Sequence, residues 1–558
     1  MATVESKILF VTTSPRTPAK MIPEIRLLKQ NFVGKEWNSE TQCAFMELLR
    51  DENFFNGTGT KDPAFSARDR INRAPKSLGF VRLSPVISLT GAGERLIAAK
   101  RTEEIFLRQL LKFQLPSPYH QAGKQASVFC IKPYLELFRL IRQFGSLKFD
   151  ELMIFALQMT DYHQFDDIIS KIEKYRSNQA QNKESYRTFR QKYLHDELKK
   201  IYRSELSTGE TKIRESTDKT KENFLSTKAR NMRDYADACI RYLRSTGIVN
   251  ISHIGKTLSI AKEKFEEVDF FLKTINREPC FTDDEKKYSD YLGNAELPKL
   301  WYDNKALILK RLKKEFPNIK VDSGTSIQRL KDLLDNSLYI RQQDILYNEV
   351  TSIKDGKKYD DIQTVFQLIE KNELYDVPLM LEWNVWRAMT MLDGGNISAN
   401  LKFDDFGNPM SVAQGNMADI VCDYESFDVT VEVTTATGQR QYEMEGEPVA
   451  RHLGKLKKTT GKETYCLFVA PSINQACVSH FYVLQKTMID YYGGLSTIIP
   501  MELGVFRKMI EDSNKVSYIP NPTQVEAFFK FSQSAAKDAL NETDWYNKVK
   551  AKALHWLD

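Results

Sequence analysis

The sequence predicts a multidomain α+β protein with N-terminal winged-helix-type domains, a helical connector and a C-terminal α/β domain. Three observations lead to this prediction. The chain has 558 residues, too many for one hydrophobic core, so two to four domains are expected. Helical periodicity dominates up to about residue 345 and is broken by short β-rich stretches. Beyond that point strand-like and helix-like segments alternate, which is typical of an α/β sandwich.

The composition indicates a folded protein without membrane segments. Hydrophobic residues make up 42% and aromatic residues 11% of the chain. No apolar run approaches the roughly 18 residues that a membrane helix needs, and no secretion signal is visible. The seven cysteines are scattered without a Cys-x-x-Cys pair, which favours free thiols and argues against structural zinc. We therefore expect a cytoplasmic protein.

The charge is distributed unevenly along the chain. Residues 1–250 hold 42 Lys and Arg against 29 Asp and Glu, whereas residues 251–558 hold 38 against 45. Residues 401–450 alone have two basic and ten acidic side chains. This pattern indicates a half that binds a polyanion joined to an acidic half suited to a metal, although two solvated faces would give the same counts.

Residues 1–125 form the first predicted domain. A basic amphipathic segment, Ala64–Arg73, is followed by two short strands near Leu78–Leu83 and Ile87–Leu89 and by a helix that begins at Thr90. This order is typical of a winged helix, in which one helix enters the major groove and the wing flanks it. A generic small α+β domain is the alternative.

Residues 126–275 are predicted to form a second, mainly helical recognition domain. Thr227–Gly247 is a long helix with a basic stripe that includes Arg230 and Arg233. Ile248–Ile251 and Thr257–Ile260 then supply a possible second wing. Residues 276–345 are periodic, with Lys and Arg on the polar face, and are expected to be a helical linker.

Residues 346–558 are predicted to be the α/β domain. Val377–Leu392 is an apolar helix, and Thr464–Pro471 is the continuous apolar run expected of a buried central strand. Pro448–Leu456 is a predicted helix, with Pro448 suitably placed in its first turn.

Two carboxylates stand out in this domain. Asp419 and Glu432 each accompany a short apolar strand, thirteen positions apart, and Tyr424–Asp428 supplies a turn between the strands. A hairpin of this kind brings both carboxylates to one sheet edge, and two oxygen ligands there suit Mg²⁺. The alternative is an acidic strand end on a solvated edge.

This spacing fits the PD-(D/E)xK nuclease pattern, in which an acidic residue is followed on the next strand by an acidic residue, any residue and lysine. Asp419 fills the first position and Glu432 the second, and the Val433 carbonyl is a possible third oxygen ligand. The lysine position holds Thr434, which cannot supply a positive charge.

The next segment offers substitutes for that lysine. His452 is a candidate general acid or base because its ordinary pKa lies near neutrality, and Glu445 is a candidate for the metal shell. Glu382, on the preceding helix, extends the acidic set. Glu447 has two structural interpretations in place of a catalytic one. It either caps a helix near Pro448 or pairs with Arg451 four residues later.

Taken together, these motifs resemble the AlwI-like type IIS restriction endonucleases and their nicking relatives. The resemblance covers nearly the whole chain in motif order, and the middle, near residues 276–345, is less distinctive. It rests on Glu382-Trp383, Asp419, Glu432–Thr435, Met444–His452 and Tyr465–Pro471, with Ser14–Pro18, Ala64–Arg70 and Leu89–Gly93 in the recognition region.

The resemblance implies a specific activity. The N-terminal part would read a short asymmetric double-stranded DNA site, and a C-terminal PD-(D/E)xK domain would cut a few bases outside it with Mg²⁺. By position, Asp419, Glu432, Glu445 and His452 match the family's catalytic residues, with Glu382 as an outlying member. The family also has Thr where the motif has Lys. Six residues are candidates for DNA contacts. Arg16, Arg68, Arg70 and Lys76 lie in the first predicted domain, and Arg230 and Arg233 lie on the basic helix of the second.

The resemblance also bears on partners. One catalytic centre cuts one strand, so a double-strand break needs a transient homodimer or a small partner subunit. A strand-specific nicking subunit of a heterodimeric enzyme is therefore an alternative, and a non-catalytic DNA-binding regulator is an alternative of a different class. A bacterial cytoplasmic location and a companion methyltransferase are expected from the restriction-modification context.

Overall fold

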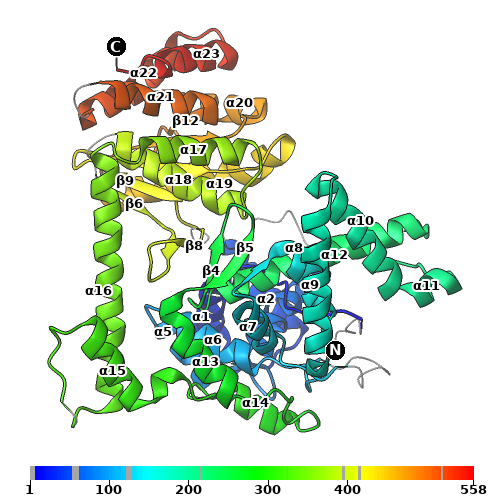
Figure 1. The fold of residues 1–558 in the computed structure, drawn as a ribbon. Coiled ribbons are helices and arrows are strands. Elements are labelled where there is room, and N and C mark those ends of the chain that lie inside the picture. Colours follow the sequence, from blue (N-terminus) through cyan, green and yellow to red (C-terminus); the bar gives the residue numbers. More distant parts are fainter. Residues whose placement is uncertain are drawn as a thin grey trace. The chain divides into compact units, whose positions relative to one another are not determined.

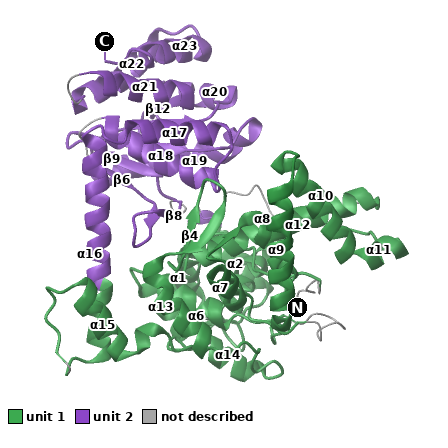
Figure 2. Ribbon diagram, viewed as in Figure 1, with its two compact units in different colours: residues 1–49, 57–335 green, residues 50–56, 336–558 purple. Residues whose placement is uncertain are grey.

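The computed structural model describes residues 7–52, 54, 62–120, 129–213, 217–322, 324–392, 396–412, 416–516 and 520–557. In this part of the chain the structure is mixed α+β and largely helical (Figure 1). The chain divides into two compact units: unit 1 holds residues 1–49 and 57–335, and unit 2 holds residues 50–56 and 336–558 (Figure 2). None of the described helices is long and apolar enough to cross a membrane.

The four-part division made from the sequence stays a prediction, and two compact units are what the structure has. The division between them falls at residues 335 and 336, inside helix α16 (Ile327–Lys354). The same helix runs through residue 345, where the sequence pattern changes.

Unit 1 begins with short helices and a two-stranded sheet. Helix α3 (Pro63–Ile71) is capped by Asp62, whose carboxylate accepts a hydrogen bond from the Phe65 backbone N–H at 2.8 Å. Strands β1 (Val81–Arg82) and β2 (Ser88–Leu89) pair antiparallel, and α5 (Gly91–Ala98) begins after its N-cap, Thr90. This order is the one expected of a winged helix, and that identification stays a prediction. The neighbouring helices are η1 (Pro18–Lys20), α1 (Met21–Phe32), α2 (Ser39–Asp51), α4 (Ala74–Ser77) and α6 (Glu103–Lys112).

A three-stranded antiparallel sheet organises the rest of unit 1. Its order is β3 (Ser146–Lys148), β5 (Thr257–Ile260) and β4 (Val249–Ser252), and the long helix α12 (Lys221–Arg244) contacts β4. The last two strands lie where the second wing was predicted. The remaining helices are α7 (Pro133–Phe144), α8 (Phe149–Ile154), η3 (Ala156–Gln158), η4 (Tyr162–Gln164), α9 (Phe165–Gln181), α10 (Tyr186–Ile201), α11 (Arg203–Thr208), η5 (Lys262–Lys264), α13 (Phe265–Thr274), α14 (Glu285–Gly293), η6 (Trp301–Asp303) and α15 (Lys305–Glu315).

Unit 2 is built on a five-stranded mixed sheet. Its order is β12 (Thr497–Glu502), β11 (Glu463–Ala470), β10 (Phe427–Val433), β9 (Ile420–Asp423) and β6 (Asn396–Ala399). Strands β10, β11 and β12 run parallel to one another, and β9 is antiparallel to both β10 and β6. The predicted central strand is β11, which is buried along nearly its whole length as a strand flanked on both sides must be.

Two helix pairs pack on this sheet. Helices α18 (Val377–Leu392) and α21 (Leu503–Lys515) contact each other and the sheet, and so do α19 (Gln439–Thr460) and α20 (Gln475–Leu484). Apolar side chains of the strands and these helices form one core. The remaining elements of unit 2 are α17 (Tyr359–Glu370), β7 (Lys402–Phe403), β8 (Pro409–Ser411), η7 (Asp490–Tyr492), α22 (Pro522–Asp538) and α23 (Glu542–Ala553).

The predicted helix start at Pro448 is wrong. Helix α19 begins at Gln439, after Gly438 with φ of +61°, and Pro448 lies inside it. Proline removes one backbone hydrogen bond from a helix interior, but α19 packs against β10 and β11. As a result Glu445 and His452 share one helix, two turns apart on the same face.

The position of α19 is also set by close packing at Gly454. A Cβ atom there would lie 2.7 Å from the Cα and the carbonyl oxygen of Tyr492, in η7. Only glycine fits this contact without displacement. This close contact fixes the position of the helix that carries Glu445 and His452 relative to η7.

Candidate active site and nucleic-acid interface

The β9–β10 hairpin brings Asp419 and Glu432 to one edge of the sheet. The last registered pair of this hairpin joins Ile420 to Val431, so Asp419 and Glu432 are the next neighbours. A backbone hydrogen bond from the Val433 N–H to the Asp419 Oδ2, 2.8 Å long, fixes the orientation of the Asp419 carboxylate. The two carboxylates therefore stand side by side, Glu432 on β10 and Asp419 in the bend just before β9.

Helix α19 adds His452 to this pair. The His452 Nδ1 lies 2.8 Å from the Glu432 Oε1, and both side chains are nearly buried. Burial, and then the positive charge of Arg451, lower the pKa of His452 to about 4, so its ring is neutral near pH 7. With Glu432 ionised, Nδ1 carries the proton and donates it, and Nε2 has a lone pair. The Nε2 atom is buried and has no hydrogen-bond partner among the described residues.

Glu445 and Glu382 complete a cluster of acidic side chains. Burial raises the pKa of Glu432 well above its usual range, and the charges of Glu445 and then Glu382 raise it further. Burial likewise raises the pKa of Glu445. Glu382, on α18, is only 4% exposed. Carboxylates so close together in a low-dielectric setting repel one another unless a cation or protons join them.

The donor set is not preformed as a metal site. Within the described part of the chain, no three Asp, Glu, His or Cys side chains are already arranged to hold a metal ion. The Glu432 Oε1 faces His452, and the Asp419 Oδ2 faces the Val433 amide. The structure thus brings the five predicted catalytic residues close together, and carboxylate oxygens of Asp419 and Glu432 face protein partners.

Thr434, at the position of the motif lysine, is tied to the cluster. Its hydroxyl hydrogen-bonds the Glu445 carboxyl group, which opposes the rise in the Glu445 pKa caused by burial. Its backbone N–H donates to the Val469 carbonyl oxygen at 3.1 Å, in β11. Thr434 therefore holds Glu445 next to the strand end and supplies no charge.

In unit 1, three of the predicted DNA-contacting residues come together at α12. The Tyr242 hydroxyl donates to the Pro15 carbonyl oxygen at 2.9 Å, which fixes the N-terminal segment against this helix. Arg16 forms an ion pair of 3.0 Å with Asp234, the residue after Arg233. Arg16, Arg230 and Arg233 are all exposed. They form a basic surface suited to phosphate groups.

The predicted DNA-contacting residues of α3 and α4, Arg68, Arg70 and Lys76, each have a partner elsewhere in unit 1. The Arg68 Nη1 donates to the Gln42 Oε1 at 2.7 Å, and the Lys76 ammonium lies 4.5 Å from the centre of the Tyr119 ring. Arg70 forms an ion pair with Glu24, which is 4% exposed. The periodic pattern of basic residues could not distinguish Arg70, which has this structural partner, from its neighbours.

Substitutions at Arg70 and Arg233 should have different consequences. Arg70→Ala is expected to lower the free energy of unfolding by on the order of 2 kcal/mol, because Glu24 stays buried without its cation. Arg233→Ala should change stability by less than about 0.5 kcal/mol. It should instead weaken DNA binding and reduce the salt dependence of the affinity by about one phosphate contact. Urea unfolding and DNA titrations at several salt concentrations measure the two effects. A reduced salt dependence for Arg70→Ala at unchanged stability would assign Arg70 to the DNA interface.

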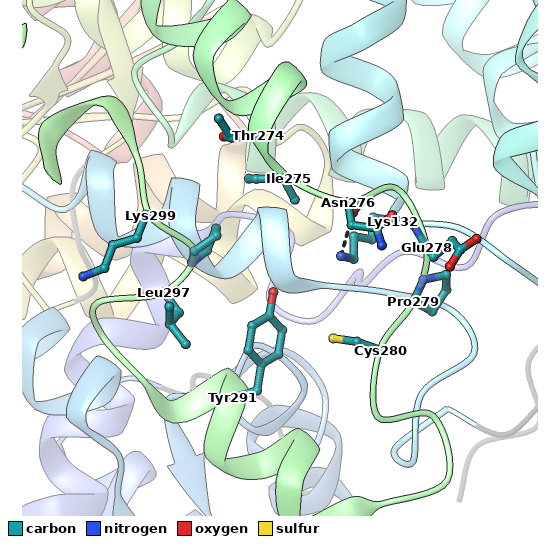
Figure 3. Close-up of a pocket in the computed structure, with 11 residues that line it drawn as sticks. Lys132, Thr274, Ile275, Asn276, Glu278, Pro279, Cys280, Tyr291, Leu297 and Lys299 are labelled. Atoms are coloured by element: carbon teal, nitrogen blue, oxygen red, sulfur yellow. Dashed lines mark hydrogen bonds between the residues drawn. The ribbon is translucent and has the colours of Figure 1, made fainter. Parts of the chain in front are cut away.

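A separate pocket of about 550 Å³ lies in unit 1 (Figure 3). It contains none of the predicted site residues. The Lys132 ammonium at its wall donates to the Asn276 carbonyl oxygen at 2.8 Å, and burial lowers the pKa of Lys132. The lining residues are Lys132, Thr274, Ile275, Asn276, Glu278, Pro279, Cys280, Tyr291, Leu297, Pro298 and Lys299.

Comparisons with known proteins bear on these sites. A family model described as AlwI restriction endonuclease matches residues 76–509. Among solved structures, the small subunit of the heterodimeric restriction endonuclease R.BspD6I matches with 25% identity and a TM-score of 0.28, over 35% of this chain and 95% of that one. The binding domain of the BpuJ1 endonuclease, solved with pyrene- and phenanthrene-modified DNA, matches with 15% identity and a TM-score of 0.31, over 50% of this chain and 92% of that one. The comparison with curated proteins gave no match.

Proposed function

Because the chain belongs to the AlwI restriction endonuclease family, we propose that it is a type IIS restriction endonuclease. Unit 1 recognises a short asymmetric double-stranded DNA site, and unit 2 hydrolyses phosphodiester bonds a few bases outside it with Mg²⁺. The catalytic part of this proposal is supported above all by the surroundings of Glu432. Its carboxylate is buried beside two other glutamates and contacts His452. We assign the mixed sheet of unit 2 and its flanking helices to the PD-(D/E)xK class on the same ground.

The side chains of the cluster fit a hard divalent cation. Asp419 and Glu432, with the Val433 carbonyl, would hold Mg²⁺, and Glu445 would join the shell. The raised pKa of Glu432, caused first by burial and then by neighbouring carboxylates, supports this assignment, because a cation would relieve both effects. When bound, Mg²⁺ lowers the pKa of a water molecule and neutralises charge on the phosphate.

His452 is the proposed general base. Its ring is held by the contact of Nδ1 with Glu432, which leaves the buried Nε2 to accept a proton from the attacking water. The lowered pKa of His452, due first to burial, keeps the ring unprotonated before the reaction. Glu382 is buried, adds negative charge that acts on Glu432, and takes no proton in this scheme.

The recognition part of the proposal rests on the basic surface of unit 1. Arg16, Arg230 and Arg233 contact phosphates, and Arg68 and Lys76 contact DNA from α3 and α4. Both winged-helix-type regions take part, each with one helix in the major groove. Because one catalytic cluster cuts one strand, a double-strand break requires a transient homodimer or a small partner subunit.

The proposal is tested by incubating the protein and Mg²⁺ with supercoiled plasmid of known sequence and mapping the ends. Cuts at a fixed distance from one asymmetric motif are expected. Linear product means that both strands are cut, and open circles alone mean a strand-specific nicking subunit of a heterodimeric enzyme. Tight DNA binding with no cleavage under any divalent metal would reject the nuclease and favour a DNA-binding regulator.

A further inference from the structure

Arg451 is a nearly buried cation beside the carboxylate cluster, and it has no role in the proposed cleavage reaction. It lies on α19 next to His452, and its side chain is 8% exposed. Burial and two glutamates raise the pKa of Glu432, and Arg451 is the cation that opposes this rise. Its Nε donates to the Glu447 carboxylate at 3.1 and 3.3 Å. This pair, four residues apart on the helix, orients the guanidinium group and leaves its Nη atoms to reach another segment.

The second segment is the one that leads into β9. The Arg451 Nη1 donates to the side-chain oxygen of Asn416. One turn further along α19, the Lys455 ammonium donates to the Asn416 backbone carbonyl oxygen at 3.2 Å. Two cations of one helix therefore hold both the side chain and the backbone of Asn416.

Asn416 is a position where such anchoring has an effect on the chain path. Its φ is +66°, in the left-handed region that a non-glycine residue adopts at some cost. Asparagine tolerates this conformation better than most residues. Three residues later the chain reaches Asp419, whose carbonyl oxygen accepts a hydrogen bond from the Asn400 N–H at 2.9 Å. The short segment from Asn416 to Asp419 is thus fixed at both ends.

We propose that Arg451 is a positioning residue for DNA cleavage: by holding Asn416 in its left-handed conformation, it keeps the Asp419 carboxylate beside that of Glu432. This inference rests on the proposed function, because it assigns Asp419 to the metal. It explains why a buried arginine stands next to His452 without touching its ring nitrogens. It also explains why the segment before the first acidic residue of the motif carries an asparagine with positive φ.

The test compares Arg451→Gln, Asn416→Ala and the double variant in the full-length protein. Each single variant should lower kcat about 100-fold, since a misplacement of about 1 Å costs that much, while the DNA dissociation constant and KM stay unchanged. The double variant should be no slower than the slower single variant, because both changes remove one contact. Arg451→Lys keeps the charge but not the forked geometry, and it should recover only part of the rate. Arg440→Gln is the matched control on the same helix, because Arg440 is exposed and bonded to the Met444 sulfur.

A second measurement without DNA separates this inference from the proposed function. Mg²⁺ should raise the melting temperature of the wild type, and the rise should be largely lost in Asn416→Ala, as in Asp419→Asn. If the wild type neither cleaves DNA nor is stabilised by Mg²⁺, the proposed function fails and this inference with it. If the wild type does both and Asp419→Asn does neither, yet Arg451→Gln and Asn416→Ala behave as wild type, only this inference is overturned. Additive losses of kcat in the double variant would also overturn it.

Discussion

Asp419→Asn and Glu432→Gln should each lower the rate of DNA cleavage by about 1,000-fold or more. A metal ion that polarises a phosphate contributes several kcal/mol to transition-state stabilisation, and about 4 kcal/mol corresponds to that factor. The amides keep the shape of the carboxylates. In the first variant the new amide oxygen still accepts from the Val433 N–H, and in the second the new amide still reaches His452. The loss would therefore report the charge of the metal ligands and not a changed fold.

The same variants should retain DNA binding and stability. Their positions lie in unit 2, and the predicted DNA-contacting residues lie in unit 1. Burial and the neighbouring glutamates already disfavour ionised Glu432, so Glu432→Gln should not lower the free energy of unfolding without metal. Single-turnover cleavage, DNA titration and melting measure the three quantities. Asp423→Asn, at the other end of β9 and paired with Lys462, is the control that should cleave normally. Wild-type rates in both amide variants would remove these carboxylates from the reaction.

The pairing of these two carboxylates follows from local sequence information. Two apolar strands and a short turn between them determine a hairpin register, and Glu425, with φ of +66°, makes that turn tight. Because the register is local, the spacing of thirteen residues was enough to place Asp419 opposite Glu432. The mixed sheet could also be predicted from local sequence information, because the unbroken apolar run of β11 indicates a buried central strand.

Other features depend on contacts that sequence patterns do not carry. Proline favours the first turn of a helix, and that local preference suggested a start at Pro448. Packing of α19 on β10 and β11 overrides it and extends the helix back to Gln439. Arg70 fits a basic stripe, but its partner Glu24 is 46 positions away. Arg451 and Asn416 are 35 positions apart, so no spacing rule links them.

His452→Ala is expected to lower the cleavage rate by about 100- to 10,000-fold, which is the usual contribution of a general base. The two ring nitrogens of His452 differ in their surroundings. Nδ1 is engaged by Glu432, so the ring cannot turn freely, and Nε2 is buried without a partner among the described residues. The Nε2 atom of His480 is also buried without a hydrogen-bond partner among the described residues, so the contact of Nδ1 with Glu432 is what marks His452 for the reaction.

A matched histidine in the same unit separates this role from a structural one. His480, on α20, is also partly buried, and burial lowers its pKa, but its ring packs against Tyr442 and, within the described part of the chain, contacts no carboxylate. His480→Ala should therefore mainly lower the melting temperature and change the cleavage rate little. His452→Ala should mainly lower the cleavage rate. His452→Gln keeps a donor toward Glu432 but has no basic nitrogen, so it should be as slow as His452→Ala. Recovery of the rate in His452→Gln would instead mean that the residue orients Glu432 and that another group accepts the proton.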